Sequence, residues 1–133
     1  MRFLQGEPVE QAGAAEHLLQ QAEKGRLRIL LHPVVLAEIV YVATSSYGLA
    51  LDRKRAVADL RALLQLPGLD VPDQGRILDA LRRFETTSLD WADCVLLSYS
   101  SDHTVYTFDR KMLRQGARQP VAESATSNDQ GVE

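Results

Sequence analysis

Three carboxylates, Glu38, Asp93 and Asp109, combine residue types and settings that suit the binding of a divalent cation. Glu38 is the clearest of the three. On a helix, the residues three and four positions away from it are all apolar or aromatic: Val34, Val35, Tyr41 and Val42. An ionised carboxylate in such surroundings destabilises the fold unless another group pairs with it. If the fold brings Asp93 and Asp109 to the same place, one cation can pair with all three, and the chemistry is that of a metal-dependent hydrolase.

Each of these acids also has a structural explanation, which the residues alone leave open. Asp109 follows a predicted strand and precedes a short predicted helix, so it can serve as an N-cap. Asp93 stands three residues after Asp90, which is the spacing of a capping box. Glu38 lies in the middle of a predicted helix, and its alternative is a buried salt bridge to an arginine. The case for a metal site therefore depends on the three residues meeting.

Composition limits the other classes of function. The chain has 133 residues, which is the size of one domain. Its single cysteine, Cys94, excludes a disulfide framework, and the three histidines show no metal-ligand spacing. We find no apolar run of membrane-spanning length and no signal pattern, so we expect a cytoplasmic protein without a membrane partner. The net charge of −3 does not favour nucleic-acid binding through the overall field. Arg110 and Lys111, beside the proposed site, are our candidates for weak contacts with substrate phosphate.

Helical periodicity and breakers predict alternating helices and short strands. We expect helices over 9–23, 33–46, 53–66, 73–84 and 91–101, a helical turn over 110–114, and strands at 27–31, 69–71 and 104–108. Asp52, Asp73 and Asp90 are the expected N-caps, and from about residue 119 the chain becomes polar, as expected of a disordered tail. This order predicts an α/β fold with a small parallel sheet, mostly helical by residue count. Asp109 would then lie past the carboxyl end of a strand, where ligands gather in such sheets.

Three ordered motifs carry a resemblance to a known family. They are VLAEIVYV at 35–42, DWADCVLL at 90–97 and TFDR at 107–110. Together they resemble the PIN domain family and, within it, the VapC-type toxins of type II toxin–antitoxin systems. The resemblance runs from Arg2 to about Arg118. It implies a PIN-like α/β/α sandwich over 1–118, followed by the polar tail at 119–133.

The resemblance also implies an activity and a set of roles. It implies an endoribonuclease that depends on Mg²⁺ or Mn²⁺ and hydrolyses RNA phosphodiester bonds as the toxin of a toxin–antitoxin pair. Glu38, Asp93 and Asp109 match the family's acidic ligands, Thr107 is a catalytic hydroxyl beside the site, and Asp90 is an accessory acid. Carboxylates suit these hard cations. The implied partners are RNA, a cognate antitoxin and a second copy in a homodimer.

The chain departs from the family pattern at its start. Family members begin with a strand that ends in an Asp-x-Asn-type motif, whereas this sequence opens at Met1-Arg2-Phe3-Leu4, which resembles the stretch after it. We therefore expect the first strand and its aspartate to be missing. This expectation keeps a second reading open, in which the chain is a catalytically inactive PIN-like fragment that binds an antitoxin or dimerises. A third reading is a helical interaction module in which the acids are caps.

Overall fold

The computed structural model describes residues 9–122. In chain order, its elements are α1 (Val9–Glu23), β1 (Ile29–Leu30), α2 (Pro33–Thr44), α3 (Arg53–Leu64), β2 (Leu69–Asp70), α4 (Gln74–Thr86), α5 (Trp91–Leu97) and α6 (Arg110–Leu113). The fold is therefore mostly helical with a small parallel sheet, as the sequence predicts. The start of the family resemblance, at residues 2–8, and most of the expected polar tail lie outside the described residues.

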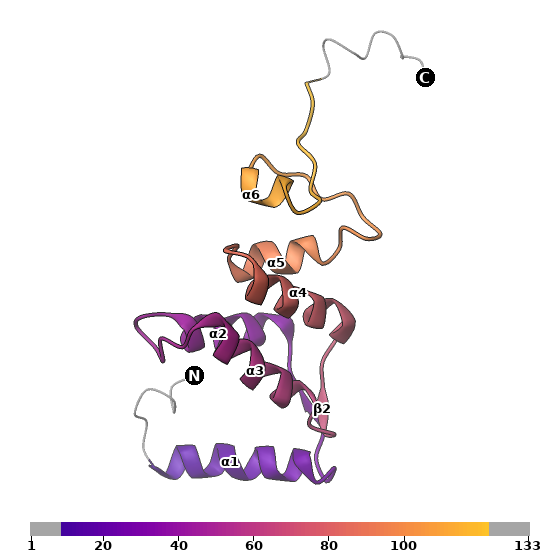
Figure 1. Cartoon of the computed structure of the whole chain (residues 1–133). Helices are drawn as coiled ribbons and strands as arrows, with labels where there is room; N and C mark the ends of the chain where they lie inside the picture. Colours follow the sequence, from indigo (N-terminus) through magenta and orange to yellow (C-terminus); the bar gives the residue numbers. More distant parts are fainter. Residues whose placement is uncertain (1–8, 123–133) are drawn as a thin grey trace.

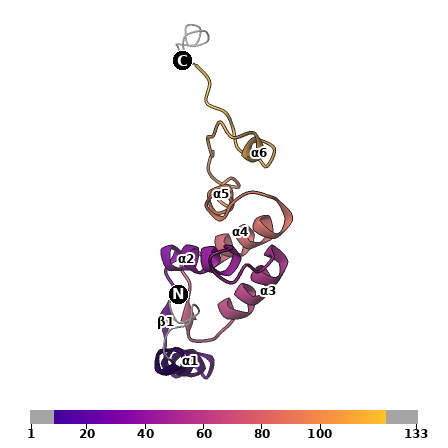
Figure 2. The ribbon, with the colours of Figure 1, turned by 90° about the vertical axis from the view of Figure 1, so that its left-hand side faces the viewer.

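The elements follow one another from one end of the molecule to the other. Figures 1 and 2 show α1 at one end, α2 to α4 in the middle, and α5 and α6 toward the opposite end. Helix α4 packs against α3 and α5, and α2 also contacts both α3 and α5. These contacts bury the apolar faces of the helices in one core. Its largest fully buried side chains are Leu36, Val40, Val57, Leu81, Cys94 and Leu97.

The sheet consists of two very short strands that pair in parallel. Ile29 stands opposite Leu69, and Leu30 stands opposite Asp70. Gly68 leads into β2, where its N–H donates to the carbonyl of Ala22 and its own carbonyl accepts from the Ile29 N–H. A Cβ atom at Gly68 would collide with the carbonyl oxygens of Leu27 and Ala22. Glycine therefore allows the close approach that joins α1 to the sheet.

Side-chain caps explain where several helices begin. His32 Nδ1 accepts from the Val34 N–H at 3.1 Å, and Pro33 opens α2 at a position where a missing N–H has no consequence. Asp52 Oδ1 accepts from the Arg55 N–H at 2.8 Å, as predicted for the start of α3. Asp73 stands at the predicted N-cap position of α4, but the expected side-chain capping bond is absent. Asp73 adopts a left-handed φ of 53°, and its side chain makes no capping bond to α4.

The predicted strand at 104–108 is wrong. This segment is extended but forms only an isolated parallel bridge, in which Tyr106 pairs with Arg118. The β-branched and aromatic pattern identified an extended segment, yet no described strand lies beside it to complete a ladder. The helix expected over 91–101 is also shorter, because α5 ends at Leu97 and the chain continues in turns. No helix in the described part of the chain is both long and apolar enough to cross a membrane.

Candidate metal centre

Asp90, Asp93 and Asp109 form an acidic cluster at the N-termini of α5 and α6. Asp90 caps α5, and its Oδ1 accepts from the Asp93 N–H at 3.0 Å. Asp109 caps α6, and its Oδ1 accepts from the Lys111 N–H at 2.8 Å. The capping roles expected of Asp90 and Asp109 are therefore confirmed. Within residues 9–122, no hydrogen bond from the Asp90 N–H to the Asp93 side chain completes a capping box. Capping occupies part of the Asp90 and Asp109 carboxylates and leaves their remaining lone pairs able to bind a cation.

Asp93 is the member of the acidic cluster whose ionisation is most disturbed. Burial raises the pKa of the Asp93 carboxyl, and the negative charges of Asp90 and Asp109 raise it further. Within residues 9–122, no ion pair joins Asp93 to a basic side chain. The cluster thus holds negative charge that a cation would relieve.

Glu38 differs from its sequence-based description. The side chain is exposed, and so are three of its four apolar neighbours, Val34 (64%), Val35 (41%) and Tyr41 (62%), whereas Val42 is buried. The buried setting inferred from the sequence is therefore wrong. Its alternative, a buried salt bridge to an arginine, is absent from the described residues too. Glu38 lines an open hollow on α2 with Val34, Ala37, Tyr41 and Val42.

The described residues do not bring all the predicted ligands into one complete set. Among residues 9–122, no group of three or more His, Cys, Asp or Glu side chains is placed to hold a metal ion. A pair of carboxylates nevertheless fits Mg²⁺, which keeps several waters and is commonly bound through one or two carboxylates. The negative charges of Asp90 and Asp109 both act on Asp93. The donor chemistry therefore suits a hard divalent cation at this place.

Thr107, the predicted hydroxyl, supports the acidic cluster through the backbone. Its Oγ1 accepts from the Asp109 N–H at 3.0 Å, and its own N–H donates to the Arg118 carbonyl at 2.9 Å. These bonds fix the entry into α6 and so orient Asp109. Arg110 and Lys111, the predicted phosphate contacts, are both exposed on the first turn of α6.

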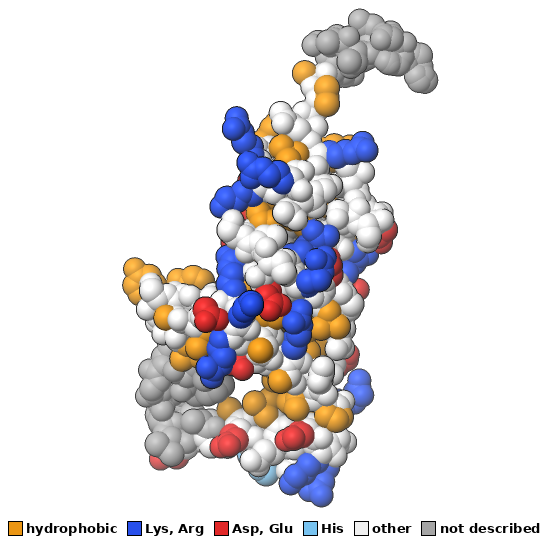
Figure 3. All heavy atoms as spheres, viewed as in Figure 1, with side chains coloured by type: hydrophobic (Ala, Val, Ile, Leu, Met, Phe, Trp, Pro, Cys, Tyr) orange, Lys and Arg blue, Asp and Glu red, His pale blue; other side chains and the backbone are white. Residues whose placement is uncertain are grey.

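Arg114 is a candidate that the sequence interpretation missed. It lines a polar hollow of about 180 Å³ with Lys111 and with the hydroxyl-bearing residues Thr86, Thr87 and Ser88. Figure 3 shows Lys and Arg side chains gathered over the end of the molecule that carries α6. The available signal was the spacing of Arg114, three residues after Lys111 and four after Arg110, which places all three close together on a helical turn.

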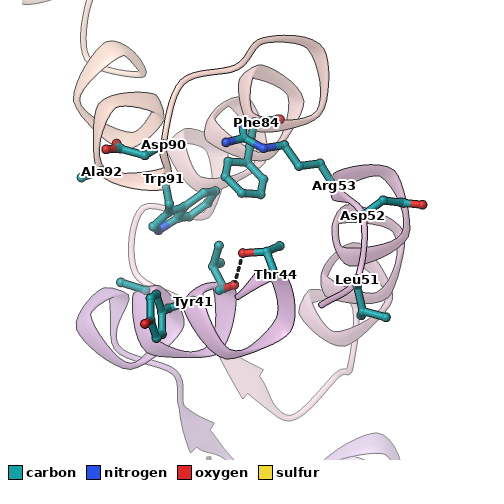
Figure 4. Close-up of a pocket in the computed structure, with 11 residues that line it drawn as sticks. Tyr41, Thr44, Leu51, Asp52, Arg53, Phe84, Asp90, Trp91 and Ala92 are labelled. Carbon is teal, nitrogen blue, oxygen red and sulfur yellow. Dashed lines mark hydrogen bonds between the residues drawn. The ribbon is translucent and has the colours of Figure 1, made fainter. Parts of the chain in front are cut away.

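A second, larger cavity borders the acidic cluster. Figure 4 shows it between α2, the start of α3, the end of α4 and the start of α5, with Asp90 at its edge. It shares Ala37 and Tyr41 with the hollow that contains Glu38. Glu38 and Asp90 thus stand at the rims of two neighbouring depressions.

Comparison with known proteins gives one match. The family model described as the PIN domain matches residues 5–117. No curated protein and no solved structure matches the chain significantly. The matched range includes α1 to α6 and every predicted site residue.

Proposed function

The chain belongs to the PIN domain family, and from this membership we propose that it is an endoribonuclease dependent on Mg²⁺ or Mn²⁺ and the toxin of a toxin–antitoxin pair. PIN domains are generally nucleases that use divalent metal ions, and they are often found in toxin–antitoxin systems. The observation that carries the proposal is the match to the PIN domain family over residues 5–117, supported by the grouping of Asp90, Asp93 and Asp109 at the starts of α5 and α6. A carboxylate whose charge is disfavoured without a cation is suited to hold one.

In this proposal, Asp93 and Asp109 are the principal metal ligands, Glu38 completes the site from α2, and Asp90 is an accessory ligand. The bound cation would lower the pKa of an attacking water and neutralise charge on the scissile phosphate. Thr107 holds the Asp109 backbone through its 3.0 Å bond and so fixes one carboxylate. Its hydroxyl also stands beside the reacting groups.

The basic side chains of α6 supply the contacts to the RNA backbone. Arg110 and Lys111 follow Asp109 directly, and Lys111 shares the polar hollow with Arg114. Phosphate groups that bind there would place the next phosphodiester beside the carboxylates. Such contacts set the register of the substrate without reading its sequence. They also explain how a chain of net charge −3 can bind RNA.

The first test combines calorimetry with an RNA cleavage assay. We expect Mn²⁺ to bind the wild-type chain, and single-stranded RNA to be cleaved only when Mn²⁺ or Mg²⁺ is present. Asp93→Asn and Asp109→Asn should each abolish Mn²⁺ binding and RNA cleavage. Asp59→Asn should change neither Mn²⁺ binding nor cleavage, because Asp59 is exposed on α3 beside Arg55. If Asp93→Asn binds Mn²⁺ as the wild type does, the proposed metal site is wrong.

A second candidate function is an inactive PIN-like module that binds an antitoxin or a second copy of the chain. The exposed apolar side chains at and after α2 favour it: Val34 (64%), Val35 (41%), Tyr41 (62%) and Tyr47 (87%). Several exposed large apolar side chains on one short stretch of chain are typical of a protein interface. Retention of dimer or antitoxin binding in a wild-type chain without nuclease activity would select this function. For either function, we propose that the chain is cytoplasmic and forms a homodimer.

A further inference from the structure

The cavity beside the acidic cluster has aromatic walls. It measures about 500 Å³ and is lined by Tyr41, Phe84 and Trp91 together with the apolar Ala37 and Val40. Tyr41 and Val40 come from α2, Phe84 from the end of α4, and Trp91 from the start of α5. A cavity of this size and composition falls within the range of small-molecule sites.

One of the three aromatic rings, that of Tyr41, is open to a ligand, because Phe84 and Trp91 are buried at 3% and 9% exposure. The Phe84 ring is already covered, because the guanidinium carbon of Arg53 lies 3.9 Å from its centroid. Trp91 meets the same ring edge to face, with centroids 5.7 Å apart and an interplanar angle of 87°. Tyr41 is 62% exposed and has no aromatic partner among the described residues. Figure 4 shows Trp91 reaching down from α5 and Tyr41 projecting from α2 below it.

The charges around the cavity select a neutral ligand. Arg53 Nη1 is within hydrogen-bond distance of the carbonyls of Phe84, Thr87 and Leu89, so this side of the guanidinium is held by the protein at the cavity wall. The other charged lining residues, Asp52 and Asp90, are acidic, and Figure 4 shows their carboxylates directed away from the interior. An anion would be repelled, whereas an aromatic ring with amino hydrogens at its edge would be favoured.

Inside the cavity, Thr44 offers one polar contact. Its hydroxyl donates to the Val40 carbonyl at 2.9 Å, which leaves the lone pairs of the Thr44 oxygen free to accept. Figure 4 places this hydroxyl between α2 and the aromatic rings. The occupant should therefore be flat and uncharged, with at least one N–H at its edge.

We infer that this cavity binds a nucleobase of the RNA substrate, stacked on the exposed Tyr41 ring, with the buried Trp91 in the cavity wall beside it. The inference rests on the proposed function, because the acidic cluster that would act on the phosphodiester begins at Asp90, at the edge of the cavity. A base held there would position its own nucleotide beside the carboxylates. Adenine should bind better than uracil, because it has a larger stacking face and an amino group facing the Thr44 acceptor.

The test uses the intrinsic fluorescence of Trp91, which is the only tryptophan in the chain. We expect adenosine to quench this fluorescence saturably and uridine to bind more weakly. Tyr41→Ala should weaken adenosine binding by about tenfold, within the range measured for the loss of one base–aromatic stack. Tyr47→Ala is the matched control, because Tyr47 is 87% exposed and does not line the cavity. The inference is overturned if adenosine gives no saturable quenching or if Tyr41→Ala binds it as tightly as the control.

Adenosine monophosphate separates this inference from the proposed nuclease function. Adenosine carries no phosphate, so its binding does not require a cation, whereas Mg²⁺ should strengthen binding of the monophosphate. If adenosine binds but Mg²⁺ has no effect on the monophosphate, the base cavity stands and the metal site falls. If Mg²⁺ strengthens monophosphate binding but Tyr41→Ala binds adenosine and its monophosphate as tightly as the Tyr47→Ala control, the metal site stands and the base cavity falls.

Discussion

At the scale of single residues, the opposite environments of two aspartates give opposite predictions. Burial and the charges of Asp90 and Asp109 raise the pKa of Asp93. Burial also acts to raise the pKa of Asp79, but hydrogen bonds from Arg83 and Arg82 outweigh it and lower the value. A raised carboxyl pKa means that the ionised form destabilises the fold, and a lowered pKa means that it stabilises the fold.

We therefore expect Asp93→Asn to stabilise the metal-free protein at pH 7, and Asp79→Asn to destabilise it. The gain from Asp93→Asn should shrink as the pH falls through the raised folded pKa and vanish below the unfolded value of about 3.8. Urea unfolding at pH 7 and pH 4 measures both effects. A loss of stability in Asp93→Asn at pH 7 would contradict the assigned repulsion among the three acids.

The thiol of Cys94 gives a separate prediction of reactivity. Cys94 is completely buried in α5, and burial raises its pKa to about 11. Because the thiolate is the reactive form, we expect the folded protein to resist thiol reagents at pH 8 and the urea-unfolded protein to react at once. Rapid labelling without urea would show that α5 opens locally.

At the scale of elements, Arg53 secures the connection between α4 and α5 to the start of α3. Its guanidinium reaches the carbonyls of Phe84, Thr87 and Leu89 and lies over the Phe84 ring. Arg53→Met keeps the aliphatic packing but leaves these carbonyls without the charged donor. We expect a loss of about 1–3 kcal/mol in urea unfolding. The neighbouring Lys54→Met should change stability by less than about 0.5 kcal/mol, because Lys54 is exposed.

Elements were predictable where a local signal determines them. The helices that begin after His32, Asp52 and Asp90 follow from capping side chains and apolar periodicity. The extended segment at 104–108 failed as a strand because pairing depends on a neighbour that is distant in sequence. The predicted burial of Glu38 was wrong for a similar reason. An apolar neighbourhood along a helix indicates burial only if another element covers that face of the helix. Asp93 and Asp109 of the acidic cluster were predicted as ligands and Asp90 as an accessory acid, whereas Glu38, predicted with them, lies in the hollow on α2. The repulsion that marks Asp93 required the spatial arrangement of the three aspartates.

At the scale of the whole molecule, basic side chains lie toward both ends, and the proposed function assigns RNA binding to only one of these groups. The hollow with Lys111 and Arg114 lies beside α6, whereas Arg28 lies at the start of β1 toward the opposite end. If RNA phosphates bind at α6, only the basic residues there should contribute to the salt dependence of binding. The net charge of the chain would then have little influence on where RNA is held.

The double change Lys111→Gln and Arg114→Gln tests whether RNA phosphates bind the basic residues beside α6. Each lost contact to a single-stranded phosphate should reduce the slope of log K against log salt by about 0.7, so the pair should reduce it by about 1.4. Fluorescence anisotropy of a labelled RNA in Ca²⁺, at several salt concentrations, measures the slope. Arg26→Gln with Arg28→Gln is the control of equal charge at the other end, and it should leave the slope unchanged. Equal reductions in the two double variants would mean that RNA binds through the overall field, and the α6 surface would have no special role.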